Sequence, residues 1–287
     1  MELFVVGLAS WLGLMAWAEL SPGGPMPAPK AESGGVRLLT WNILHGQEHG
    51  PPWQQNNWPA RKLGLGEALR EALPDILFVQ EARACQLTFL DATLPLHRRI
   101  GVGRDDGQSG GEHCAIYFHG GRFQQLDGGT FWLAEPMDRP PGPGQTMKRI
   151  CTWVRLHDQV SGRTLRIYNA HQYLTRRAQL PAVRLLLSRV RAGDPSDAIV
   201  LAGDFNASPQ ARSRRVFAQA GLRETAALAG KNGGATYQLS GIRLRSLDGV
   251  LVGPGWRVEQ YAVVTVKPRG LFPSDHFGVL VDLMLGR

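Results

Sequence analysis

Acidic, amide and imidazole side chains follow five of the short apolar runs in the sequence. In chain order they are Asn42, Glu81, His171, Asp204 with Asn206, and Asp275 with His276. The ends of strands are where rigid scaffolds commonly present chemically active groups. Taken singly, each side chain has a structural explanation, such as an Asx-turn, a helix cap or a buried histidine. Because such ends recur along one chain, we predict that they form one catalytic site.

These residue types combine oxygen ligands for a cation with two imidazoles. Mg²⁺ prefers oxygen ligands and retains several waters, so one or two carboxylates and an amide are sufficient to bind it. The chain supplies such a set in Glu81, Asp204, Asp275 and Asn42. An imidazole with a pKa near neutrality can activate water or protonate a leaving oxygen, and His171 and His276 are candidates for these tasks. The combination favours metal-assisted hydrolysis of a phosphate ester.

The elements that must position these residues are short and mostly extended. Apolar runs predict strands at residues 36–40, 76–79, 115–118, 130–133, 151–156, 165–170, 198–202, 249–252, 258–266 and 278–283. Helical periodicity appears at residues 60–73, 85–94, 180–190 and 212–220, and Pro74 ends the first of these segments. Strands and helices do not alternate strictly. This order predicts an α+β fold, an α/β sandwich of two mixed β-sheets packed face to face with helices outside.

Composition narrows the class of protein further. With 43% hydrophobic and 20% charged residues, the 287-residue chain is neither a disordered segment nor a multi-span membrane protein. Its 35 glycines and 19 prolines indicate many tight turns, which argues against a helical bundle. The net charge of +8 favours polyanionic partners, although no dense basic run is present. Cys85, Cys114 and Cys151 lack the spacing of a zinc site, and their disulfide state stays open.

The N-terminal segment differs from the rest of the chain. Residues 3–18 are almost entirely apolar and end in Ala16-Trp17-Ala18, a small-x-small pattern that suits signal peptidase. The start contains Glu2 and lacks a basic residue, so the alternatives are an uncleaved anchor or a wrongly chosen start codon. We therefore predict a signal peptide or N-terminal anchor at 1–18, a Pro/Gly-rich linker at 19–35 and a catalytic domain at 36–287. The expected location is secreted or periplasmic, with membrane contact only if the segment is retained.

The polar strand ends also carry a resemblance to a known family. Trp41-Asn42, Gln80-Glu81, Asn169-Ala170-His171, Gly203-Asp204-Phe205-Asn206 and Ser274-Asp275-His276 resemble, in order, the signatures of the endonuclease/exonuclease/phosphatase superfamily. Segments 57–62, 74–76, 101–107, 111–112 and 130–133 resemble an uncharacterised bacterial branch of it. The resemblance spans most of the chain after the linker. It implies a four-layer, DNase-I-like fold and metal-dependent phosphoesterase activity.

The resemblance implies a role for each matching position on the metal and water side. Glu81 matches the family's metal ligand, Asn42 is the ligand or orienting amide beside it, and Asp275 is a further carboxylate on the metal side. Mg²⁺ is the implied ion, with Mn²⁺ or Ca²⁺ as alternatives. Asp204 matches the residue that orients or deprotonates the attacking water. Asn206 matches a donor to a non-bridging phosphate oxygen.

Further positions are implied on the substrate side. His276 matches the imidazole that contacts the phosphate or the attacking water, and Asp248 matches the aspartate that orients it. His171 matches a histidine on the leaving-group side. Arg149 stands where some family nucleases place an arginine that grips phosphate. Substrate binding is therefore assigned to Arg149, Asn206 and His171.

The chain departs from the family pattern at a few positions beside the predicted site. Gln172-Tyr173 replaces the usual Leu-Asp after the histidine, Gly249 replaces a tyrosine, and Ala134 replaces a serine. Because of these changes, the sequence does not define the substrate pocket near His171 or the packing around Asp248. The set of matching metal-binding residues is complete.

These observations lead to one expected function and two alternatives. We expect an exported, Mg²⁺-dependent phosphoesterase that hydrolyses a phosphodiester, with nucleic acid favoured by the basic charge. The first alternative is a phosphomonoester or a lipid or inositol headgroup as substrate, as in sphingomyelinases. The second is a binding module without turnover, against which the complete catalytic set argues. We expect a monomer with no obligate protein partner.

Overall fold

The computed structural model describes residues 23–30, 34–46, 57–142, 147–239 and 241–286 of the chain. The predicted signal peptide or anchor at 1–18 lies outside the described residues. Within the described ranges, no helix has the length and apolar character that crossing a membrane requires.

Two six-stranded mixed sheets form the centre of the domain. The first has the order β13 (Trp256–Val264), β14 (Gly278–Leu285), β1 (Val36–Asn42), β2 (Ile76–Ala82), β4 (His113–His119) and β3 (His97–Ile100). The second has the order β5 (Phe123–Trp132), β6 (Ile150–Asp158), β7 (Thr164–His171), β8 (Ala198–Asp204), β12 (Asp248–Val252) and β9 (Arg223–Glu224). Each sheet contains one parallel pair, β1 with β2 and β7 with β8, and its other pairs are antiparallel.

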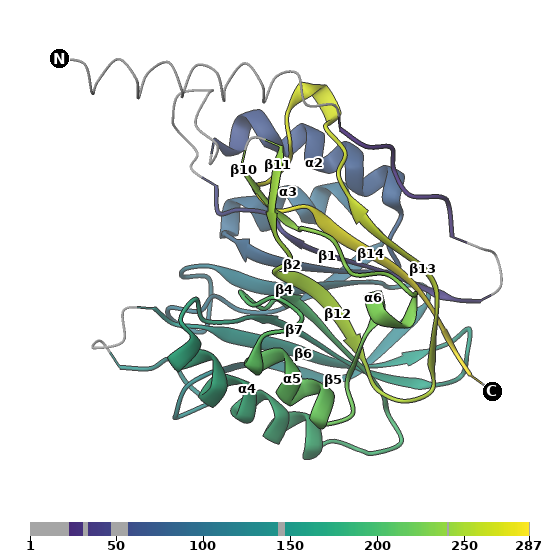
Figure 1. Cartoon of the computed structure of the whole chain (residues 1–287). Helices are drawn as coiled ribbons and strands as arrows, with labels where there is room; N and C mark the ends of the chain where they lie inside the picture. The colour runs from purple at the N-terminus through teal and green to yellow at the C-terminus, as the bar shows by residue number, and fades with distance from the viewer. Residues whose placement is uncertain (1–22, 31–33, 47–56, 143–146, 240, 287) are drawn as a thin grey trace.

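Helices cover the outer face of each sheet, which gives four layers (Figure 1). α2 (Trp58–Ala72) and α3 (Ala84–Thr93) lie over the first sheet, and α4 (Arg176–Arg191) and α5 (Arg212–Gln219) lie over the second. The short α6 (Thr225–Leu228) lies beside β12 and β13, and β10 (Tyr237–Leu239) pairs with β11 (Ile242–Arg245) in a separate hairpin. The predicted sandwich of two mixed sheets with outer helices is confirmed.

The sequence specifies these layers through its buried strands and its helix ends. Along β2, Phe78 joins the core between the sheets, whereas Leu77 and Val79 pack in the core beneath α2 and α3. A strand buried on both faces has no polar alternation, so it appears in the sequence as a continuous apolar run. α2 begins where Oδ1 of Asn57 accepts from the Ala60 N–H at 3.2 Å.

The predicted elements are present, and the structure adds several that the sequence pattern did not indicate. Every predicted strand and helix overlaps an observed one. The additional strands β3, β9, β10 and β11 are short, and most of their residues are polar or exposed, so no apolar run marks them. β5 begins at Phe123 rather than at 130, because the residues that follow Phe123 are exposed on an edge strand.

The described part of the predicted linker is held against the domain. The Gly24 N–H donates to the Thr265 carbonyl at 2.9 Å, and Nζ of Lys30 lies 2.6 Å from Oδ2 of Asp75. Nη2 of Arg37 donates to the Ala28 carbonyl at 2.8 Å. Residues 23–30 therefore form part of the folded surface.

Candidate active site

The candidate residues meet at one end of the sandwich, where the parallel strands of both sheets finish. Asn42 is the last residue of β1, and Glu81 is next to last in β2. In the second sheet His171 ends β7 directly opposite Asp204, which ends β8. Asp248 begins β12 opposite Asp204 in the antiparallel pair. The carboxyl ends of parallel strands are the usual place for a site in such folds, and here two sheets contribute side chains to it.

Asp204 lies at the centre of the site. Its Oδ2 accepts from Nδ2 of Asn42 at 3.0 Å. The same oxygen lies 3.5 Å from Nε2 of His171 and 3.9 Å from Nε2 of His276. Its Oδ1 accepts from the backbone N–H of Asn206 at 2.8 Å. One carboxylate therefore joins four of the residues that the sequence predicted.

Asp248 and His276 form a buried pair beside Asp204. Nδ1 of His276 lies 2.7 Å from Oδ2 of Asp248, and ligand-type atoms of all three residues lie within 4.8 Å of one another. Burial lowers the pKa of His276, but the charge and hydrogen bond of Asp248 outweigh this effect and raise the pKa to about 10. Burial and the negative charge of Asp248 raise the pKa of Asp204 to about 6. A carboxyl group in this range can exchange a proton with water near neutral pH.

Glu81 approaches the cluster from the first sheet. Its backbone has a φ of 63°, a conformation that is rare for glutamate and common at functional sites. Nδ2 of Asn42 donates to its Oε1 at 2.9 Å, and Nδ1 of His45 lies 3.1 Å from its Oε2. Burial opposes ionisation of Glu81, but the hydrogen bonds from His45 and Asn42 outweigh it and hold the pKa well below its usual range. Glu81 is therefore an anion.

Asn42 connects the two carboxylates. Its Nδ2 donates to both Glu81 and Asp204, whereas its Oδ1 accepts from the Leu44 N–H at 3.0 Å. An amide N–H is the group that two carboxylates attract, so this geometry gives Asn42 an orienting role. Its assignment as a metal ligand stays a prediction.

Glu81 and Asp275 are two carboxylates that could hold a hard cation. Burial raises the pKa of Asp275, and the negative charge of Glu81 adds to this rise against the opposing charge of His276. Two carboxylates that repel each other fit a divalent cation, because the ion would relieve the repulsion. The cluster of Asp204, Asp248 and His276 is a second candidate, but its hydrogen bond already uses Nδ1 of His276.

His171 is held by Arg149 on the side away from Asp204. Nη1 of Arg149 lies 2.6 Å from Nδ1 of His171. A guanidinium can only donate, so Nδ1 accepts and the proton of a neutral imidazole is on Nε2, which faces Asp204. Burial and the positive charge of Arg149 lower the pKa of His171 well below its usual value. His171 therefore presents a neutral N–H donor at the centre of the site.

Asn206 adopts a strained backbone conformation next to Asp204. Its φ is 48°, in the left-handed region that asparagine tolerates better than most residues. Nδ2 donates to the Gln172 carbonyl at 3.0 Å, which uses one of the two hydrogens of the amide. The second hydrogen is the one that a phosphate oxygen would receive if the predicted role is right.

Two residues outside the predicted set hold the loops of the site together. Nη1 of Arg61 donates to the carbonyls of Ile43 and Pro273, at 2.9 and 2.5 Å. The Ser274 hydroxyl donates to the Asn42 carbonyl at 2.6 Å. Both residues lie in segments that resemble the family, but the sequence alone gave neither a role, because the contacts join segments far apart in the chain.

The structure explains one departure from the family pattern, Gly249. At a second departure, Gln172, the side chain lacks a hydrogen-bond partner among the described residues. A Cβ on Gly249 would lie 2.7 Å from Nη2 of Arg214, whose guanidinium stacks 3.8 Å from the ring centroid of Phe205. Arg214 therefore fills the space next to Gly249. Gln172 is buried, and neither Oε1 nor Nε2 of its side chain has a hydrogen-bond partner among the described residues.

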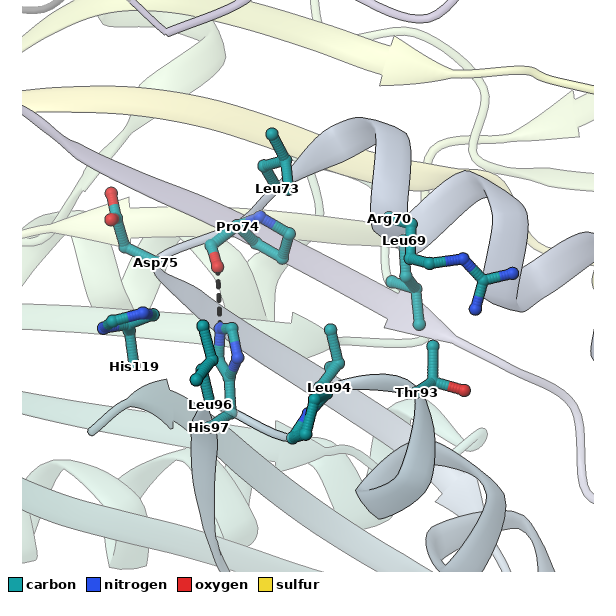
Figure 2. A pocket seen from close by; sticks show the side chains of 11 residues that line it. Leu69, Arg70, Leu73, Pro74, Asp75, Thr93, Leu94, Leu96, His97 and His119 are labelled. Carbon is teal, nitrogen blue, oxygen red and sulfur yellow. Dashed lines mark hydrogen bonds between the residues drawn. The ribbon is translucent and has the colours of Figure 1, made fainter. Parts of the chain in front are cut away.

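A separate hollow lies at the opposite end of β2 from Glu81 (Figure 2). It has a volume of about 260 Å³ and is lined mainly by leucines and prolines, including Leu73 and Leu96. Nε2 of His97 lies 2.9 Å from the Pro74 carbonyl there. The hollow contains none of the predicted site residues.

Comparison with known families and structures agrees with the fold. Residues 39–276 match the endonuclease/exonuclease/phosphatase family, which covers most of the chain. The chain belongs to this family, and it is accordingly a phosphoesterase of a metal-dependent class. No curated protein sequence matches it at a significant level.

Several solved structures resemble the whole domain. A family member from Bacteroides thetaiotaomicron has 25% sequence identity and a TM-score of 0.79, covering 88% of this chain and 98% of its own. A mannosyl-6-phosphatase from Bacteroides thetaiotaomicron has 26% identity and a TM-score of 0.78, covering 87% of this chain and 100% of its own. The catalytic domain of human Nocturnin shares the fold at 20% identity, with a TM-score of 0.71 and coverage of 88% and 95%.

Proposed function

We propose that this chain is a Mg²⁺-dependent phosphodiesterase that cleaves its substrate by in-line attack of water. The observation that carries the proposal is the convergence on Asp204, which contacts Asn42 at 3.0 Å and lies 3.5 Å from His171 and 3.9 Å from His276. A phosphoryl transition state spreads negative charge over several oxygens, so fixed donors around one carboxylate suit it.

The residues divide into a water side and a phosphate side. Asp204 accepts the proton of the attacking water, since burial and Asp248 raise its pKa to about 6. His276, held by Asp248 at 2.7 Å, donates from Nε2 to the phosphoryl group or positions the water. His171 and Asn206 donate to the remaining phosphate oxygens, and Arg149 supplies positive charge behind His171.

Glu81 and Asp275 are the proposed metal ligands, with Asn42 orienting Glu81 at 2.9 Å. When bound, Mg²⁺ would polarise a phosphoryl oxygen and offset the developing negative charge. The oxygen-only set also accepts Mn²⁺ or Ca²⁺, and it offers no thiolate that would favour zinc.

Nucleic acid is the proposed substrate because the net charge of +8 suits a polyanion. A phosphomonoester of a small polar molecule is the second candidate. It is favoured by the similarity to the mannosyl-6-phosphatase, at 26% identity over 87% of this chain. The apolar segment 3–18 supports export, or anchoring if it is retained, and we propose a monomer without an obligate protein partner.

The test measures whether the full-length protein hydrolyses each of a panel of substrates. The panel contains DNA, RNA, bis(p-nitrophenyl) phosphate, p-nitrophenyl phosphate, mannose 6-phosphate, inositol phosphates and sphingomyelin. Each reaction is run with Mg²⁺, with EDTA, and with the variant Asp204→Ala. We expect cleavage of diesters that needs Mg²⁺ and falls on the order of 10²-fold or more in the variant. Asp138→Ala, which removes an exposed carboxylate, is the control. Selective cleavage of monoesters would replace the diester proposal with the second candidate.

A further inference from the structure

The helical layer over the second sheet has an exposed row of arginines. Arg177, Arg184 and Arg191 are exposed on α4, and Arg212 and Arg215 are exposed on the neighbouring α5. We call these five residues the arginine face. A hydrogen bond of 3.1 Å from the Ser213 hydroxyl to Oε1 of Gln179 joins the two helices, which lie side by side in Figure 1. The arginine face therefore belongs to one packed surface.

Three of the five arginines of α4 are regularly spaced. Arg177, Arg184 and Arg191 follow one another at intervals of seven residues, so they lie along one side of the helix. Seven residues advance an α-helix by about 10 Å. Three steps along a stacked nucleic-acid strand advance by about the same distance, since each step is about 3.4 Å. The row thus matches every third phosphate of such a strand.

No acidic residue on these helices neutralises the arginine face. The segments of α4 and α5 contain neither aspartate nor glutamate. Other arginines of this half of the domain are paired. Arg166 on β7 lies 2.7 Å from Asp197, and the buried Arg214 of α5 lies 2.7 Å from Glu224 on β9. Unpaired exposed arginines favour contact with phosphate, because the guanidinium can donate two parallel hydrogen bonds to it.

The row also begins close to the active site. α4 starts five residues after His171, and Nε2 of Gln179 donates to the Asn206 carbonyl at 3.0 Å. Arg177 is therefore the arginine of the row nearest to His171 in sequence, and Arg191 is the farthest.

We propose that the arginine face binds the phosphate backbone of a nucleic-acid strand whose cleaved bond lies in the active site. This inference rests on the proposed nucleic-acid hydrolysis and adds a second contact region to it. A lipid surface fits less well. The apolar side of α4, including Val183 and Leu186, is buried against the second sheet, and a helix that binds a membrane needs that side free.

The binding experiment separates this inference from the proposed catalysis. The full chain with Asp204→Asn is titrated, in EDTA, against a fluorescein-labelled single-stranded oligonucleotide at several salt concentrations, and fluorescence anisotropy is followed. The row variant carries Arg177→Gln, Arg184→Gln and Arg191→Gln. We expect its affinity to fall about tenfold or more, with a salt slope smaller by about 2, because each lost phosphate contact removes about 0.7 from the slope.

A matched control removes the same charge elsewhere. Arg70→Gln, Arg98→Gln and Arg163→Gln change three exposed arginines on α2, β3 and the loop between β6 and β7. This control should keep the affinity and the salt slope, and a row variant with lysines instead of glutamines should keep most of the binding. In the chain with Asp204 intact, turnover of bis(p-nitrophenyl) phosphate should be unchanged in all variants.

Three results would overturn the inference. The first is an equal loss of affinity in the row variant and the matched control, which would reduce the effect to overall charge. The second is oligonucleotide binding that the row variant leaves intact. The third is a row variant that loses binding to phosphatidylglycerol vesicles but keeps its binding to the oligonucleotide. This result would assign the face to a membrane. The protein could also fail to cleave DNA and RNA while the row variant still loses oligonucleotide binding. That result would contradict the proposed catalysis and leave the binding surface established.

Discussion

Nε2 of Gln80 donates to Oδ1 of Asn169 at 2.7 Å, and this hydrogen bond joins the two sheets directly beneath the catalytic candidates. Gln80 is the neighbour of Glu81 in β2, and Asn169 lies two residues before His171 in β7. Nδ2 of Asn169 also donates to the carbonyls of Val79 and Ala115, at 3.0 and 2.9 Å. The hydrogen bond therefore fixes the spacing between two strands of the site. β2 carries Glu81 on the metal side, and β7 carries His171 on the phosphate side.

Asn169→Ala should destabilise the fold. The substitution removes one of the two acceptors of Nε2 of Gln80, which keeps Oγ1 of Thr40 at 3.1 Å, and it removes a donor from two buried carbonyls. Each unsatisfied buried group costs about 1–3 kcal/mol. We expect the free energy of unfolding to fall by about 3 kcal/mol in urea denaturation. Gln124→Ala, at an exposed position of β5, is the control and should change it little. An unchanged urea midpoint in Asn169→Ala would show that the bond does not couple the sheets energetically.

The central strands were predictable from sequence because both of their faces are buried. β8, for example, is almost wholly apolar before it ends at Asp204. The edge strand β3 was not predictable, since its four residues His-Arg-Arg-Ile have no apolar pattern and only pairing with β4 makes them extended. An edge strand takes its conformation from its neighbour, and a single sequence holds no record of that neighbour.

The candidate site was predictable where a polar residue ends an apolar strand, as at Glu81 and Asp204. The supporting contacts were not predictable. Arg61 bonds to the Pro273 carbonyl across 212 residues of chain, and His45 lies in a loop without any motif. Such contacts depend on how the strands are ordered in space. The orienting geometry of Asn42 also needed the structure, because either end of its amide suited the motif.

Asp248→Asn should lower the pKa of His276. Burial alone lowers that pKa, and the charge of Asp248 raises it to about 10, so a neutral amide removes the larger effect. Imidazole proton shifts followed by NMR in EDTA should show a midpoint at lower pH than in the wild type. Turnover should fall on the order of 10²-fold, because the imidazole loses its orienting partner. Asp138→Asn should leave both quantities unchanged, and a midpoint that stays near pH 10 in Asp248→Asn would contradict the assignment.

Asp158→Asn should make the free energy of unfolding depend less steeply on pH under acidic conditions. Burial opposes the ionisation of Asp158, but hydrogen bonds from Arg122 at 2.9 Å and from Ser161 at 2.8 Å outweigh it and lower the pKa. A carboxyl whose pKa is lower in the folded state contributes stability above its unfolded pKa, and this contribution is lost as the pH falls below about 4.

Urea denaturation between pH 6 and pH 3 measures the effect of Asp158. The wild-type free energy of unfolding should decline more steeply below about pH 4 than that of Asp158→Asn, although the variant is less stable at neutral pH. Asp138→Asn should keep the wild-type slope. Parallel curves for wild type and Asp158→Asn would mean that the ion pair with Arg122 does not set the acid stability.

Arg149→Met should change both the tautomer of His171 and the rate. Nη1 of Arg149 lies 2.6 Å from Nδ1 of His171, so the arginine holds the proton on Nε2, where it faces Asp204. Without the guanidinium, Nδ1 is free to carry the proton, and the donor toward the phosphate is lost in that fraction of molecules. Removal of the positive charge should also let the pKa of His171 rise, although burial continues to lower it.

Nitrogen NMR of the imidazole reports the tautomer of His171 directly, because protonated and unprotonated ring nitrogens resonate far apart. Wild type should show a protonated Nε2, and Arg149→Met should show a mixture, together with a fall in turnover on the order of 10²-fold. Arg149→Lys tests charge against geometry: an ammonium keeps the charge but has no planar fork, so the rate should recover only in part. Arg139→Met, at an exposed arginine, is the control. A wild-type spectrum with the proton on Nδ1 would overturn the role assigned to Arg149, since a guanidinium cannot accept a hydrogen bond.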